Sequence, residues 1–474
     1  MISPLRSVPL NQSDMKYITT FLLLFLFLAC SSGGKEPAAT DPPRLLTSDP
    51  AQGQDDVAEG TTEITLRFDQ NVTLAPSPLI TLNGVRIADL RPGTGGELKF
   101  VVPPLEPATT YTLVVPGNTV KGPTSVYLPA EIRLTFKTRT PASPREGLSS
   151  QAEKLLQYLL EQEGKATLSG TMANVAWNIN EAEWVHQHTG KWPAINCFDY
   201  IHLQHSPANW IDYGNTTVAE EWWNNGGLVF AMWHWNVPAN NGEEGAYSFY
   251  WGSNPEQTLF DVTQIDDPDS EEYKRMIADI DKLSGYLKLL KDKNIPVVWR
   301  PLHEAAGNTG VYTGGTAWFW WGGGGAEPFK KLWRLMFDRM THHHGLDNLI
   351  WVWTSQMTDL DWYPGDDYVD MVGRDIYNAS GASTIKNEFT TLQNRYPGKP
   401  IALSECGNVA NVSAQWIAGA KWLWFMPWYN YNRTLNPGSE AFLQETHEHA
   451  PISWWEDALS QTYVITRDEL PDLK

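Results

Sequence analysis

The stretch Pro296–Glu304, PVVWRPLHE, is a short apolar run that ends in charged residues. So short an apolar run is typical of a strand buried on both faces of a parallel sheet. Seven further runs of this kind occur from residue 166 onwards, separated by segments with helical periodicity. They are ATLSG (166–170), AINCFDY (194–200), LVFAMWHW (228–235), LIWVW (349–353), YVDMVGRDIY (368–377), PIALSE (400–405) and KWLWFMPW (421–428).

The segments between these runs predict helices. In 152–160, apolar side chains recur at i, i+3, i+4, i+7 and i+8, which places them on one helix face. The ranges 271–294 and 329–340 show the same periodicity. Buried strands that alternate with helices eight times predict a (β/α)8 TIM barrel, although a doubly wound sheet has the same alternation.

The ends of the runs favour the barrel. Most of the runs finish with, or beside, a charged or aromatic side chain. A TIM barrel builds its active site from the carboxyl ends of its strands, so this pattern predicts a site at the mouth of a barrel. The end residues are Asp199, His234, Glu304, Tyr377, Glu405 and Trp428.

Charge and cysteine content exclude several classes of protein. The chain has 35 Lys and Arg against 55 Asp and Glu, a net charge of −20, which argues against a nucleic-acid binder and a polybasic membrane-surface protein. Only three cysteines occur, too few for a disulfide scaffold or a Cys-based zinc site. The tract His342–His344 precedes a glycine helix stop, where histidine meets the helix dipole favourably, so we expect no metal and no cofactor.

The N-terminus predicts export. Residues 17–29 are a short apolar run that resembles the core of a signal peptide, and Cys30 follows where a bacterial lipobox has its lipid-bearing cysteine. We therefore predict a signal peptide over residues 1–29, with Met1 or Met15 as the start. A flexible tether over 30–43 follows, in a lipoprotein anchored to a membrane, at the outer surface of a Gram-negative bacterium. A cleaved signal for soluble secretion is the alternative.

Two domains of different composition follow. All 23 tryptophans lie at or beyond Trp177, so the first third of the chain contains none. Residues 44–139 instead show short alternating strands such as Glu63–Phe68, Thr110–Val115 and Ile132–Lys137, with turn residues between them. This pattern predicts a small all-β sandwich, and it resembles the bacterial Ig-like domains found beside surface enzymes. We expect it to act as a spacer, with weak glycan binding as the alternative.

A linker over residues 140–148 leads to the predicted barrel domain, residues 149–474. The tryptophans of that domain suit a sugar-binding cleft, since sugars stack their C–H faces on aromatic rings, or they fill a large core. Composition alone leaves both interpretations open.

Two strand-end carboxylates suggest the chemistry. Glu304 and Glu405 follow buried-looking strands, so both can face the barrel mouth. Glycoside hydrolysis needs such a pair, one group to protonate the leaving oxygen and one to attack or to activate water. We expect ionised Glu405 to raise the pKa of Glu304 through like-charge proximity.

Four motifs together carry a family resemblance. RPLHE at Arg300–Glu304, WFWWG at Trp318–Gly322, LSECG around Glu405 and WHWNVP at Trp233–Pro238 resemble glycoside hydrolase family 26, over about residues 150–474. The resemblance implies an endo-β-1,4-mannanase of the retaining barrel type, with Glu304 as acid/base and Glu405 as nucleophile. It also implies substrate-site roles for His234, His303, Trp318, Tyr377, Trp428 and Arg300.

The alternatives are a β-xylanase or mixed-linkage β-glucanase of the same family, or a non-catalytic surface glycan-binding lipoprotein. We expect a β-mannan polysaccharide or oligosaccharide as partner, no nucleic acid, and a monomer. Two long insertions, 236–270 and 305–327, could build an open groove for endo action or a wall for exo action, and the open groove is our expectation.

Overall fold

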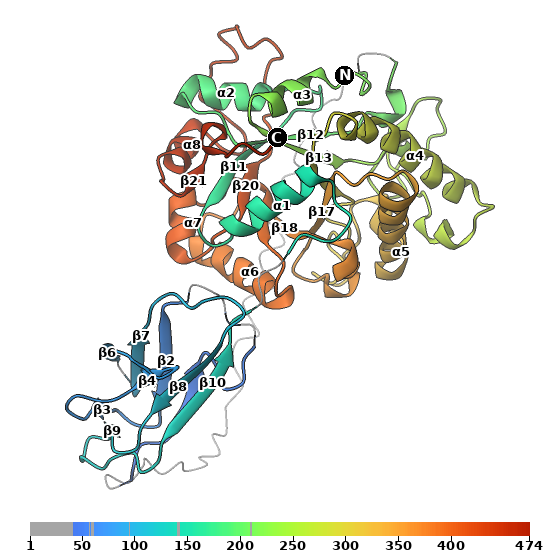
Figure 1. The fold of residues 1–474 in the computed structure, drawn as a ribbon. Helices are drawn as coiled ribbons and strands as arrows, with labels where there is room; N and C mark the ends of the chain where they lie inside the picture. Colours follow the sequence, from blue (N-terminus) through green and yellow to red (C-terminus); the bar gives the residue numbers. More distant parts are fainter. Residues whose placement is uncertain (1–40, 56, 58–60, 94, 140–142, 209–210) are drawn as a thin grey trace, which may run out of the picture. The chain divides into compact units, whose positions relative to one another are not determined.

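The computed structural model describes residues 41–55, 57, 61–93, 95–139, 143–208 and 211–474. The chain divides into two compact units, with the boundary between Arg139 and Thr140 (Figure 1). The predicted signal peptide, Cys30 and most of the tether lie outside the described residues. Among the residues that are described, no helix is long and apolar enough to cross a membrane.

The first unit is built of antiparallel strands in two four-stranded sheets, with the orders β1-β2-β7-β6 and β10-β8-β4-β5, and a short β3–β9 pair. The three strands predicted from alternation, β2, β8 and β10, have the predicted bounds, because every second side chain enters one apolar core. The strands are β1(Leu45–Asp49), β2(Glu63–Phe68), β3(Thr73–Leu74), β4(Thr81–Leu82), β5(Val85–Arg86), β6(Asp89–Pro92), β7(Glu97–Val101), β8(Thr110–Val115), β9(Val120–Lys121) and β10(Ile132–Lys137).

The second unit is a closed parallel barrel, which confirms the predicted TIM barrel. Its strands follow the order β12-β13-β16-β17-β18-β19-β20-β11, and β11 pairs back onto β12. A doubly wound sheet would have two open edges, so this closure excludes it. The strands are β11(Thr167–Met172), β12(Ile195–Asp199), β13(Leu228–Trp233), β16(Val297–Pro301), β17(Leu349–Thr354), β18(Met371–Tyr377), β19(Ile401–Gly407) and β20(Trp424–Pro427), with β21(Val464–Ile465) added outside β11.

Helices surround the barrel (Figure 1). The predicted apolar face of α1 is buried, and the Ser149 hydroxyl accepts a hydrogen bond from the Ala152 amide at its N-terminus. The helix predicted over 329–340 is α-helical to Phe337 and then continues as a π-helix over Asp338–His343. The helices are α1(Ser150–Gln162), α2(Asn180–Thr189), α3(Thr217–Asn224), α4(Glu271–Lys291), α5(Ala326–Phe337), α6(Ala382–Arg395), α7(Val412–Ala418) and α8(Ile452–Leu459).

The barrel domain begins within the predicted linker. Arg145 forms an ion pair with Asp370, at 3.1 Å, and donates a hydrogen bond to the Leu349 carbonyl. These contacts attach the chain to the barrel before α1 starts.

Most of the tryptophan content is structural. At least twelve tryptophans are fully buried, among them Trp299, Trp351 and Trp353 on barrel strands. Seventeen of the 23 are buried in all, so few tryptophans remain to face a substrate.

The two long insertions are joined to each other. The loop after β13 contains a short hairpin, β14(Val237–Pro238) and β15(Tyr247–Ser248). Beyond it, Tyr250 forms an antiparallel bridge with Phe319 of the loop after β16, and the Trp251 amide donates to the Trp318 carbonyl over 2.8 Å. The two loops are thus held together beyond the carboxyl ends of their strands.

Candidate active site

Glu304 is not at the end of its strand, as we predicted, but in the turn that follows. Strand β16 ends at Pro301, and both Leu302 and Glu304 adopt left-handed backbone conformations, with φ of 49° and 50°. Such conformations cost non-glycine residues about 1–3 kcal/mol each and persist where the surroundings enforce them. They are typical of functional sites.

The WFWWG motif holds this turn in place. The Trp321 indole donates a hydrogen bond to the His303 carbonyl over 3.0 Å, and the Trp320 indole donates to the Trp235 carbonyl over 2.7 Å. A Cβ on Gly322 would lie 1.8 Å from the Ala305 carbonyl oxygen, so only glycine fits against the turn. The motif therefore fixes the turn that carries Glu304.

Glu405 lies on β19, and both of its carboxylate oxygens accept hydrogen bonds. Arg300 Nη1 donates to Oε2 over 3.0 Å, and the Tyr377 hydroxyl donates to Oε1 over 2.6 Å. Arg300 is held by the Thr354 hydroxyl, 2.9 Å from its Nε. Three residues singled out from the sequence, Arg300, Tyr377 and Glu405, thus form one buried network.

Asp375 is part of the same network, and sequence reasoning missed it. It lies opposite Glu405 in the β18–β19 register, accepts from Arg300 Nη2, and accepts from the Ser404 hydroxyl over 2.7 Å. Because Asp375 precedes Tyr377 by two positions on a strand, both side chains lie on one face. That alternation is the signal that could have identified it.

The two glutamates have different electrostatic environments. The Glu304 carboxyl makes no hydrogen bond or ion pair with another described residue, and burial, followed by the Asp375 and Glu405 charges, raises its pKa well above the usual range. Burial also raises the pKa of Glu405, to about 7, with Asp375 adding to the rise, but Arg300 and the Tyr377 hydroxyl oppose it. Glu405 is thus the group stabilised as an anion, and Glu304 is the group that holds a proton.

The expected effect of Glu405 on the pKa of Glu304 is present, but it is not the largest. Like-charge proximity to Glu405 contributes, but burial contributes most and Asp375 contributes more than Glu405. The half-buried Glu304 carboxyl also has no side-chain hydrogen bond that would favour its anion.

Two histidines lie side by side at the mouth. Their ring centroids are 4.6 Å apart. His234 directly follows β13, and its ring Nδ1 lies 2.6 Å from an oxygen of buried Asp199, whose other oxygen accepts the His234 amide. These two contacts with Asp199 fix the ring orientation. His303 is buried, which lowers its pKa well below the usual range and keeps it neutral.

Aromatic rings surround the histidines. The Trp428 ring lies 5.7 Å from that of His234. The ring of Phe319, which the sequence did not single out, is 5.1 Å from His303 and 6.1 Å from His234. Trp318 is 36% exposed, and its ring contact within this group is with Phe319, so it lies farther out.

The described residues contain no group of three His, Cys, Asp or Glu side chains arranged to hold a metal ion. In the His342–His344 tract, His344 lies 2.7 Å from Asp281, and His342 lies 3.7 Å from Asp338. Cys406, beside Glu405, is fully buried, and burial raises its thiol pKa well above the usual range. It is therefore a core residue.

A closed parallel barrel with two unequal carboxyl groups at its mouth defines the class of barrel glycoside hydrolases. The model of glycosyl hydrolase family 26 matches residues 146–451, and the chain belongs to that family. A bacterial Ig-like domain matches residues 39–138. Both matches confirm what the sequence motifs indicated, while the lipoprotein signal stays a prediction.

Named relatives are similar to the barrel region. A mannan endo-1,4-beta-mannosidase of Thermothelomyces thermophilus is 33% identical over 70% of this chain and 66% of its own length. Mannan endo-1,4-beta-mannosidase B of Piromyces sp. is 31% identical over 68% of this chain and 52% of its own. The chain thus spans about half to two thirds of the length of these relatives.

Solved structures agree with the fold. The family 26 domain of an endo-beta-mannanase/endo-beta-glucanase from Prevotella bryantii has a TM-score of 0.62 at 38% identity, covering 69% of this chain and 98% of that one. A beta-mannanase from a symbiotic protist of the termite Reticulitermes speratus, complexed with gluco-manno-oligosaccharide, has a TM-score of 0.57 at 30% identity. It covers 70% of this chain and 97% of its own.

Proposed function

We propose that the chain is a retaining, endo-acting glycoside hydrolase that cleaves β-1,4-mannosidic bonds in mannan, glucomannan or galactomannan. The proposal rests on one observation, which is that two carboxyl groups at one barrel mouth have different electrostatic environments. Glu405 accepts hydrogen bonds from Arg300 and Tyr377, which favour its anion, whereas the Glu304 carboxyl has no side-chain partner and its pKa is raised well above the usual range. A glycosidase needs one group of each kind.

The reaction follows from this assignment. Glu405 attacks the anomeric carbon while Glu304 donates its proton to the leaving glycosidic oxygen, which gives a glycosyl ester on Glu405. The Glu304 carboxylate then takes a proton from water, and that water attacks the anomeric carbon and releases Glu405. Two inversions at one carbon return the β configuration.

The remaining site residues orient the sugar. We assign His234 and His303 as hydrogen-bonding groups at the cleavage point, since Asp199 fixes one ring and burial keeps the other neutral. Trp428 supplies the platform beneath that sugar, and Trp318 contacts the chain farther out.

The choice of mannan rests on the relatives, several of which are named as mannan endo-1,4-beta-mannosidases. The name of the Prevotella bryantii protein adds endo-beta-glucanase, so glucan is the first alternative to test.

Purified protein should be incubated with mannan, glucomannan, xylan and mixed-linkage glucan, and reducing sugar measured. We expect release from mannan and glucomannan. Cleavage of only xylan or mixed-linkage glucan would contradict the specificity, and no release from any of the four would contradict the enzyme assignment. Proton NMR of the first products should show the β-anomer before mutarotation, as retention demands.

We also propose that the chain is an exported lipoprotein of the bacterial surface, anchored through Cys30. The apolar run 17–29 and the lipobox-like residues that follow support this. In cells fed a labelled fatty acid, label should appear in the wild-type protein and be absent from a Cys30→Ala variant. Cleavage of the protein by protease added to intact cells would show that it is exposed at the cell surface.

A further inference from the structure

The loop between β20 and α8, residues 428–451, reaches the candidate site at both of its ends. Trp428, the proposed sugar platform, follows β20 directly. At the returning end, the ring of His449 lies edge to face with that of Tyr377, with the centroids 5.7 Å apart. The Tyr377 hydroxyl in turn donates to Glu405. Whatever fixes the returning end of the loop therefore also bears on the candidate nucleophile.

The His449 ring is packed between two strand ends. A Cβ on Gly407, the last residue of β19, would lie 2.6 Å from His449 Nδ1 and 2.7 Å from carbons of the Tyr377 ring, so the two rings meet over this glycine. Both ring nitrogens of His449 are buried and have no hydrogen-bond partner among the described residues, and burial lowers the pKa of the ring to about 4. The ring is therefore neutral and acts on Tyr377 by packing.

His447 holds the backbone that carries this ring. Its Nδ1 accepts from the His449 amide over 2.9 Å and from the Ala450 amide over 3.0 Å. Because backbone amides can only donate, Nδ1 is the acceptor and the ring proton belongs on Nε2. Nε2 lies 3.0 Å from Glu181 Oε2 and donates to it. These contacts define one tautomer and one orientation of the His447 ring.

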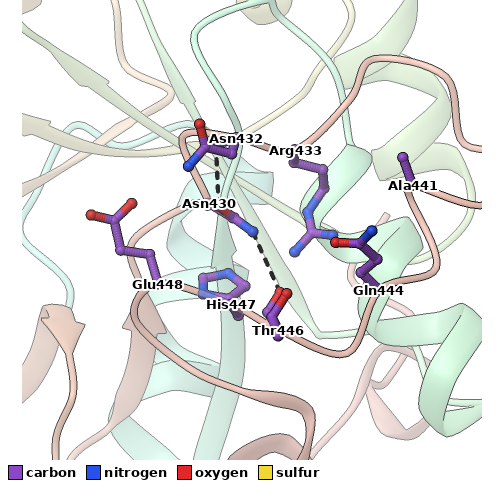
Figure 2. Close-up of a pocket in the computed structure, with 8 residues that line it drawn as sticks. All are labelled: Asn430, Asn432, Arg433, Ala441, Gln444, Thr446, His447 and Glu448. Atoms are coloured by element: carbon purple, nitrogen blue, oxygen red, sulfur yellow. Dashed lines mark hydrogen bonds between the residues drawn. The ribbon is translucent and has the colours of Figure 1, made fainter. Parts of the chain in front are cut away.

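Glu181 of α2 anchors His447 to the barrel. Its other carboxylate oxygen accepts from Arg433 Nε, and the side chains of all three residues are only 2–3% exposed. Figure 2 shows Arg433 and His447 on the two limbs of the loop, which a hydrogen bond from Asn430 to the Thr446 carbonyl joins. Since water does not compete for these buried contacts, they fix the loop more firmly than exposed ones would.

We propose that His447 and Glu181 are positioning residues for Tyr377. His447 sets the backbone at residues 449–450, this backbone places the His449 ring, and the ring keeps the Tyr377 hydroxyl against Glu405. Chains of packed side chains and hydrogen bonds of this kind can carry an effect from one element to another. The proposal rests on the proposed function, in which Glu405 is the nucleophile.

An effect of His447 on Glu405 is expected to pass through Tyr377. Besides burial, the groups that shift the pKa of Glu405 most are Asp375, Arg300, the Tyr377 hydroxyl and His234. Of these four, only Tyr377 lies against the His449 ring.

The test compares His447→Leu with His447→Asn. Both substitutions remove the imidazole and its donor to Glu181, but the oxygen of the Asn side chain can still accept from the two backbone amides. We expect His447→Leu to move the acidic limb of kcat/KM to higher pH by roughly half a unit or more and to lower kcat about threefold or more, because Tyr377 then stabilises the Glu405 anion less. His447→Asn should restore most of the wild-type profile. Glu445→Ala, at an exposed position of the same loop, is the control.

A second pair of variants isolates the role of the hydroxyl. In a Tyr377→Phe background, His447→Leu should move the acidic limb no further, because the hydroxyl that His447 positions is absent. An equal shift in that background, or a wild-type profile for His447→Leu alone, would overturn the proposal. If His447→Leu does not fold, His449→Ala takes its place with the same expectations, since it removes the packed ring and leaves the contacts of His447 and Glu181.

Crystal structures of the wild type and the variants test the positioning without turnover. The Tyr377 hydroxyl should leave hydrogen-bond distance of Glu405 in His447→Leu and stay within it in His447→Asn. If the wild type cleaves no glycan yet the hydroxyl is displaced in this way, the positioning stands and the enzyme assignment falls. An undisplaced hydroxyl in His447→Leu would overturn the positioning, whether or not the protein is an active enzyme.

Discussion

Asp375 and Glu405 lie directly opposite each other on strands β18 and β19, and the guanidinium of Arg300 donates to both carboxylates. Two buried carboxylates in register repel each other, so the Asp375 charge raises the pKa of Glu405 while Arg300 opposes the rise. Asp375 thus acts on the candidate catalytic pair without contacting the sugar.

The first prediction is that Asp375→Asn shifts the pH profile of kcat/KM towards acid. The Asp375 charge raises the pKa of both Glu304 and Glu405, so its removal lowers both. The alkaline limb, which reports loss of the Glu304 proton, and the acidic limb, which reports ionisation of Glu405, should both move to lower pH. If kcat fell but the pH profile of kcat/KM did not move, Asp375 would have only a structural role. Asp361→Asn, at an exposed position, is the control.

Tyr377→Phe should move the acidic limb in the opposite direction. The Tyr377 hydroxyl donates to Glu405 over 2.6 Å and lowers its pKa, so the variant should need a higher pH to ionise Glu405. A hydrogen bond to a charged group contributes about 1.5–3 kcal/mol, so we also expect kcat to fall by about tenfold or more. If the acidic limb moved to lower pH instead, as expected for Asp375→Asn, the proposed hydrogen bond from Tyr377 to the Glu405 anion would be contradicted.

The two candidate catalytic glutamates should differ on an activated aryl mannoside. Glu405→Ala should lose nearly all turnover on every substrate, because no glycosyl ester can form. Glu304→Ala should retain the first step on this substrate, whose leaving group needs little protonation, and should lose activity on mannan. Rapid-quench measurement of aryl alcohol release separates the cases, and equal losses in both variants would show the roles to be wrongly assigned.

Much of the barrel could be predicted from sequence, because strands buried on both faces read as continuous apolar runs. All eight runs contain or overlap a barrel strand. The position of Glu304 could not be predicted, because its left-handed turn is held by Trp321 and Gly322, which come from the following loop. The buried contact between Arg433 and Glu181 could not be predicted either, because 252 residues separate the two in the chain.

Stability should depend on the glycine that supports the Glu304 turn. A Cβ at Gly322 would lie 1.8 Å from the Ala305 carbonyl oxygen, so Gly322→Ala must displace the backbone of the turn. We expect a lower Tm and reduced kcat together. Gly285→Ala is the matched control, because this exposed α4 position has open space around it and alanine should stabilise the helix by about 0.5–1 kcal/mol. An unchanged Tm for Gly322→Ala would show that the turn adapts freely.

The mode of attack follows from where exposed aromatic rings lie. Tyr250 and Trp318, 51% and 36% exposed, stand on the joined loops after β13 and β16, whereas Tyr431, 58% exposed, stands on the loop after β20 beside Trp428. Platforms on both the Glu304 side and the Trp428 side suit a chain that continues in both directions from the cleavage point. We therefore predict endo action on mannan, with oligosaccharides of mixed length released in the first minutes and a rapid fall in viscosity.

Removal of the ring in Tyr250→Ala should raise KM for long substrates more than for short ones, because only a long chain spans both platforms. Release of a single disaccharide from the first time point, with little change in viscosity, would instead indicate a groove closed at one end.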